Sequence, residues 1–189
     1  MFFEKFDEIA SNPKAWVYKG EELEYAADIL AEFEKLHVRP SRKYSDDVYE
    51  HTFISVMPQV IMLYSFSLEN YIKALLINDK KIMLDDKGGL VFDDNGKTSR
   101  LNHTLIDYLR MLNIDIDQDS EKVLKMYERH IFWEGRYPSP LYRDKYLKKF
   151  DKNNVGEWPN TYFPIEDIKN IKRVAIQLRD IIEEEIFKL

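Results

Sequence analysis

The chain of 189 residues contains no cysteine, six glycines and seven prolines, and it lacks an excess of positive charge. Without cysteine it can form no disulfide, no zinc-thiolate site and no thiol nucleophile. The few glycines and prolines, together with 44% hydrophobic residues, exclude collagen-like and disordered chains. The first residues also lack the basic and apolar regions of a secretion signal, so a cytoplasmic protein is expected.

The charge balance restricts the partners that the chain can attract. Lysine and arginine number 28 against 34 aspartates and glutamates, which gives a formal net charge of -6. No global positive field is therefore available to collect DNA or an anionic membrane surface, and any RNA contact has to be local. The longest apolar run, from Val56 to Leu68, is shorter than the roughly 20 residues of a membrane span. It predicts a buried core helix instead.

Apolar residues recur at helical spacing along most of the chain. Between Trp16 and His37 the residues Ile29, Leu30 and Phe33 predict one apolar helix face. The same periodicity predicts further helices near residues 1 to 10, 45 to 78, 101 to 112, 119 to 131 and 165 to 186. Within the central stretch Pro58 must either kink a helix or begin a new one.

One segment breaks the helical pattern. Two short apolar runs near residues 82 to 96 are bounded by Gly88-Gly89 and Asn95-Gly96, which are turn signals typical of a β-hairpin. The sequence therefore predicts an all-α protein, an antiparallel helical bundle of five to six helices with a small β-hairpin insertion. No domain boundary is visible, and residues 1–189 are expected to form a single domain.

The most distinctive short stretch of the sequence follows the predicted helix that ends near residue 131. Gly135 allows a sharp turn, and Pro138 stiffens the chain that follows. Arg136 would then be held in place, where its guanidinium suits a phosphate or carboxylate, with Trp133 and Tyr137 as stacking neighbours. The alternative is a helix end in which Arg136 pairs with an internal acid and the aromatic rings pack.

Two histidines are candidate proton-transfer groups. His103 has Asp107 four residues later, and His130 has Glu134 at the same spacing, so a carboxylate could orient either imidazole as a general base. Either histidine could equally be a structural hydrogen-bonding residue at a helix end. No metal-ligand spacing is present, so neither a metal site nor a cofactor is predicted.

Glu69 and Lys73 are the charged exceptions in the apolar central helix. Because they are four residues apart, their side chains share one helix face and can pair. A buried carboxylate requires such a partner, and Arg136 is a second candidate. A structural ion pair is favoured, and a ligand-binding or catalytic carboxylate is the alternative.

Three segments occur in the order found in bacterial proteins of the HEPN superfamily. The segment from Tyr64 to Ile77 resembles their ALENLLKALLI helix. The segment from Leu101 to Leu105 resembles their GHDL motif, and the segment from Gly135 to Pro138 is similar to their GRYP motif. The resemblance covers roughly residues 48 to 186.

The resemblance implies a helical bundle, frequent homodimerisation, and a role in RNA cleavage, nucleotide binding or bacterial defence and stress responses. Ribonuclease members carry an arginine that is followed, after four to six intervening residues, by a histidine, and this chain has no such pair. A noncatalytic HEPN-like binding domain is therefore expected, with RNA, a nucleotide or a protein as its partner. A divergent metal-independent ribonuclease that uses Arg136 with His103 or His130, and a purely structural subunit, are the alternatives.

Overall fold

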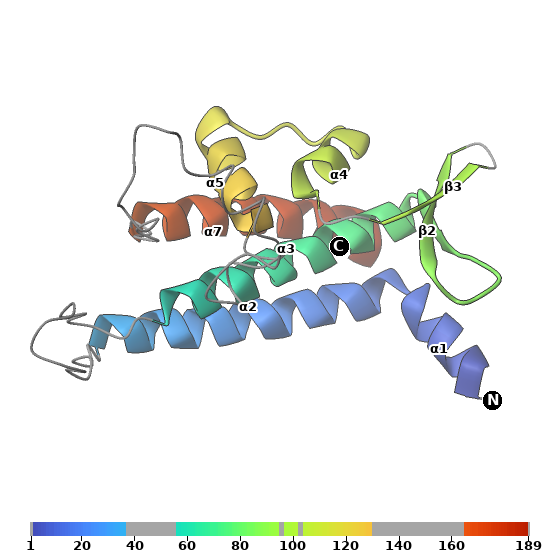
Figure 1. Ribbon diagram of the computed structural model, residues 1–189, viewed down its shortest axis with the longest axis horizontal. Coiled ribbons are helices and arrows are strands. Elements are labelled where there is room, and N and C mark those ends of the chain that lie inside the picture. Colours follow the sequence, from blue (N-terminus) through green and yellow to red (C-terminus); the bar gives the residue numbers. More distant parts are fainter. Residues whose placement is uncertain (1, 37–55, 95–96, 102–103, 130–164, 189) are drawn as a thin grey trace, which may run out of the picture.

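The computed structural model describes residues 2–36, 56–94, 97–101, 104–129 and 165–188. Most of these residues are helical, which confirms the predicted all-α class. Figure 1 shows the long helices α2, α3 and α7 lying alongside one another, with α1 and the sheet at one end. Within the described ranges there are six α-helices: α1 (Phe2–Ala10), α2 (Pro13–Leu36), α3 (Met57–Asn78), α4 (Leu105–Met111), α5 (Gln118–Arg129) and α7 (Ile165–Ile182), which a π-helical turn (Glu183–Phe187) extends.

Helix α3 forms the centre of the core. Pro58 lies in its first turn, where a missing N–H costs nothing, so this proline begins the helix rather than kinking it. Most residues of α3 are buried, among them Ile61, Leu68 and Leu75. By length and composition α3 could span a membrane, but 72% of its most apolar window is buried inside the protein. It is the core helix that the sequence predicts. The predicted start of this helix near residue 45 lies outside the described residues.

Helix α2 packs on α3 through small residues. A Cβ atom placed on Gly20 would lie 2.5 Å from Cε1 of Tyr71, so the two helices approach more closely there than any side chain on Gly20 would allow. Ala27 and Ala31 continue the buried face. The predicted apolar face is only partly buried, because Leu30 packs against the core whereas Ile29 and Phe33 are exposed. Close packing selects Gly20, Ala27 and Ala31 for that face, where Val17 is the larger buried apolar residue.

A small antiparallel sheet follows α3. Strand β1 (Ile82–Leu84) pairs with β2 (Leu90–Asp94), with Ile82 opposite Phe92, and this confirms the predicted hairpin. A third strand that the sequence pattern does not predict, β3 (Lys97–Arg100), pairs with the other edge of β2. The ring of Phe92 lies 5.2 Å from that of Tyr108, and this contact fixes the sheet against α4.

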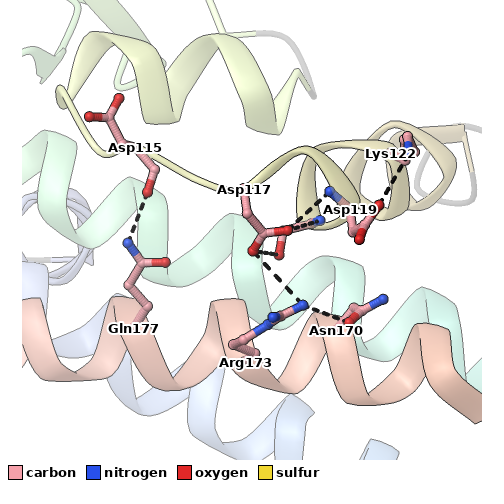
Figure 2. A network of polar contacts seen from close by, with 8 residues as sticks. Asp115, Asp117, Asp119, Lys122, Asn170, Arg173 and Gln177 are labelled. Carbon is pink, nitrogen blue, oxygen red and sulfur yellow. Dashed lines mark hydrogen bonds and ion pairs between the residues drawn. The ribbon is translucent and has the colours of Figure 1, made fainter.

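The connection between α4 and α5 is attached to α7 by polar contacts (Figure 2). Asp117 accepts hydrogen bonds from the backbone N–H groups of Asp119 and Ser120, so Asp117 caps the start of α5. Its other carboxylate oxygen lies 3.8 Å from a guanidinium nitrogen of Arg173. The Gln177 amide also donates to the backbone carbonyl of Asp115 at 3.0 Å.

Candidate functional site

The structure describes two of the predicted site residues, Glu69 and Lys73. The other five lie outside the described residues, so their roles stay predictions: His103, His130, Trp133, Arg136 and Tyr137.

Glu69 and Lys73 form the ion pair that their spacing predicts. The Glu69 side chain is buried, and its Oε1 lies 2.6 Å from Nζ of Lys73, which is itself only 15% exposed. The ammonium group also lies 5.3 Å from the centre of the Trp16 ring, within the range of a cation-π contact. The charge on Glu69 is therefore compensated locally, as a buried carboxylate requires.

Trp16 connects this pair to the N-terminal end of the molecule. Its indole N–H donates to the backbone carbonyl of Ala10 at 2.9 Å, so the ring is fixed between the end of α1 and the start of α2. The backbone there is held as well, because the Asn12 side chain accepts from the N–H of Lys14 at 3.0 Å. A rigid aromatic ring in this position forms part of the wall of a pocket.

The pocket has a volume of about 510 Å³ and lies between α1, α2, α3 and the β1–β2 turn. Phe6 and Ile9 line it, yet each remains about half exposed, at 54% and 53%. Gly88 lies at the turn with a φ of +74°, and a Cβ atom there would come within 3.5 Å of the Phe6 ring. The lining residues are mainly apolar: Phe6, Ile9, Ala10, Ala15, Trp16, Lys19, Asn70, Gly88 and Leu90.

Sequence reasoning did not find this pocket, because three separate segments build it. The sequence pattern predicts a helix at the start of the chain and a turn at Gly88-Gly89, but nothing in the pattern places both beside Trp16. The Gly88 position is a usable signal, since a residue with positive φ beside an aromatic ring favours glycine. Glycine there leaves room that a side chain would fill.

A second polar arrangement lies where α2, α3 and α7 meet. The Tyr71 hydroxyl donates to Oε2 of the buried Glu24 at 2.7 Å, and a guanidinium nitrogen of Arg179 lies 3.6 Å from Oε1 of the same carboxylate. Burial and the hydrogen bond to Glu24 raise the pKa of the Tyr71 hydroxyl. This hydroxyl therefore remains a protonated hydrogen-bond donor near neutral pH.

The same arrangement recurs one turn further along α2. The Tyr64 hydroxyl donates to Oδ1 of Asp28, and Nζ of Lys172 lies 2.6 Å from the same oxygen. Burial and Asp28 raise the pKa of Tyr64. Burial alone would raise the pKa of Asp28, but the hydrogen bonds from Lys172 and Tyr64 outweigh it and hold that pKa below its usual value. Each set joins three helices, so both are structural.

The outer face of α2 carries a row of exposed apolar side chains. Its exposed members, which recur at helical spacing opposite the face packed on α3, are Tyr18 at 54%, Tyr25 at 70%, Ile29 at 52% and Phe33 at 37%. We call these four residues the α2 stripe. Such a row on one long helix marks an interaction surface more often than scattered single residues do.

No family model, curated protein or solved structure matches the chain in the three comparisons made.

Proposed function

We propose that this chain is a noncatalytic HEPN-like binding domain whose binding site is the pocket beside Trp16. The pocket supports the proposal because its volume of about 510 Å³ falls within the range typical of small-ligand sites, which are concave and mostly apolar. The HEPN-like assignment rests on the three sequence segments described above.

The buried charges of the described helices are held in pairs, which is compatible with a binding role for the pocket. Lys73 is paired with Glu69 and covered by the Trp16 ring, so neither charged group of the pair is presented to a ligand as a free acid or base. Glu24 and Asp28, the carboxylates deepest on α2, are likewise each held by a tyrosine and a cation. A proton-transfer role would require one of these networks to open.

A neutral fluorescent probe, N-phenyl-1-naphthylamine, tests the pocket directly. We expect saturable binding to the wild-type protein and a loss of about tenfold in affinity in the Ile9→Ser variant, since an apolar wall is replaced by a hydroxyl. Ile176→Ser is the matched control, because Ile176 is 50% exposed on α7 and is not one of the residues that line the pocket. Equal losses in the two variants would exclude the pocket as the site.

The ribonuclease alternative has its own test. Cleavage of a mixed RNA pool in EDTA is measured for the wild-type protein and for Arg136→Ala, His103→Ala and His130→Ala, with folding followed by circular dichroism. The proposal predicts no cleavage by any of the four proteins. Cleavage by the wild-type protein that disappears in a folded variant would establish an enzyme and overturn the noncatalytic assignment.

The proposal includes a homodimer, for which the α2 stripe is the candidate interface. Large side chains bury about 150–250 Å² each, so four that are about half exposed offer roughly 400 Å² per copy. This is about half of the roughly 800 Å² that each partner contributes to a stable interface, so a concentration-dependent dimer is expected. In sedimentation velocity, Tyr25→Ser/Ile29→Ser should shift the protein to monomer and Ile176→Ser should not.

A further inference from the structure

The charge distribution of the pocket identifies the chemistry that would fill it. Of the residues that line it, Lys19 alone is charged, and the others are apolar except for Asn70. The Asn70 amide nitrogen already donates to the backbone carbonyl of Phe66 at 2.6 Å, within its own helix. The pocket therefore offers an apolar interior and a single cation.

Lys19 can exchange its present partner for a ligand. Its Nζ lies 2.9 Å from a carboxylate oxygen of Glu22, three residues later on α2, and both side chains are well exposed, at 59% and 68%. An exposed pair of this kind contributes little to stability, because water screens the attraction and both long side chains lose freedom. An anionic group at the edge of the pocket can replace the Glu22 carboxylate at small cost.

The start of α2 adds to the positive potential. Ala15 lines the pocket and belongs to the first turn of this 24-residue helix. Asn12 accepts from the first-turn N–H groups of Lys14 at 3.0 Å and of Ala15 at 3.1 Å, so this helix end adds only a small positive potential to that of Lys19. The lysine and the helix end therefore favour an anion on the same side of the pocket.

We propose that the pocket binds a monomeric, unbranched carboxylate of medium chain length, an inference that rests on the proposed function. The alkyl tail would lie among Phe6, Ile9, Trp16 and Leu90, and the carboxylate would pair with Lys19. Burial of the tail would cover the parts of Phe6 and Ile9 that are now exposed. A nucleotide fits less well, since a phosphate group carries more negative charge and more acceptor oxygens than a carboxylate, and Lys19 is the one cation among the lining residues.

Isothermal titration calorimetry with octanoate, decanoate and dodecanoate below their micellar concentrations tests this proposal. Affinity should rise about fourfold per methylene while the tail is being buried. Decylamine, which has the same number of carbon atoms as decanoate but a positive head, should bind at least tenfold more weakly. Affinity that does not depend on chain length, or equal binding of decylamine, would overturn the inference.

Two charge variants separate the head from the tail. Lys19→Gln should lower the affinity for decanoate about three- to fivefold, which is the loss expected for one partly exposed ion pair. The affinity for neutral decanol should not change. Lys122→Gln is the matched control, because Lys122 is an exposed lysine on α5 that pairs with Asp119 three residues earlier. Equal effects of the two variants on decanoate would exclude Lys19 as the partner of the carboxylate.

Failure of this inference and failure of the proposed function give different results. If the naphthylamine probe binds in the pocket and decanoate does not, the pocket is a binding site for another class of ligand. If neither binds, the proposed function fails with the inference. An anionic amphiphile could also come from a lipid surface, and sedimentation with phosphatidylglycerol vesicles tests this source. If the protein binds vesicles through Lys19 but does not bind decanoate, the proposal of a monomeric ligand is wrong and a lipid surface is the partner.

Discussion

The two faces of helix α2 differ in side-chain size and in exposure. The face toward α3 is built from Gly20, Ala27 and Ala31, with Glu24 as its buried charged residue. The opposite face presents the α2 stripe, whose side chains are larger and more apolar. Hydrophobicity alone would assign the faces the other way round. Here the close helix contact selects small residues on the inner face, and large apolar residues remain exposed on the outer face.

The largest effect is expected at the closest contact between the helices. Gly20→Val should destabilise the protein by about 2–3 kcal/mol, because any Cβ at this position meets the Tyr71 ring and the helices must separate. Chemical denaturation monitored by circular dichroism measures the free energy of unfolding. The destabilisation should be smaller in a Tyr71→Leu background, since the obstructing ring is removed. An equal loss in both backgrounds would show that contact with Tyr71 is not its cause.

The comparison of the faces also explains what the sequence could predict. Helix positions and the Glu69–Lys73 pair follow from spacing within one segment, and both were predicted. The spacing does not predict which face of α2 packs on α3. Ile29 and Phe33 have the spacing of a core face, yet both are exposed in the structure. The pocket and the two carboxylate-tyrosine-cation sets require residues from three or more segments. No local pattern contains that information.

A smaller effect is expected from the buried carboxylate on the packed face. Glu24→Ala should lower the free energy of unfolding by about 1–2 kcal/mol, because the buried Tyr71 hydroxyl loses this acceptor and Arg179 loses this carboxylate. Glu22→Ala, on the same helix but in an exposed pair with Lys19, should change the free energy of unfolding by less than about 0.5 kcal/mol. Similar values for the two variants would mean that Glu24 is not a structural link between the helices.

The smallest effect concerns Asp28, which is 41% exposed at the border between the two faces. Because the folded protein holds the pKa of Asp28 below its usual value of 3.8, the ionised carboxylate contributes stability above that pH and loses it as the pH falls further. Asp28→Asn keeps an oxygen that can accept from Tyr64, so it isolates the charge. At pH 7 this substitution should lower the free energy of unfolding by less than about 1 kcal/mol, because water screens the ion pair between Asp28 and Lys172.

The difference between wild-type protein and Asp28→Asn should therefore shrink as denaturation curves are recorded from pH 7 to below pH 4. Asp119→Asn removes a more exposed charge, paired with Lys122 on α5, and serves as the control for general effects of acid. If the Asp28 difference stayed constant with pH, its effect would come from packing rather than from the charge. The carboxylate would then belong to the packed face alone, and its contact with Lys172 would contribute nothing measurable to holding α7 against α2.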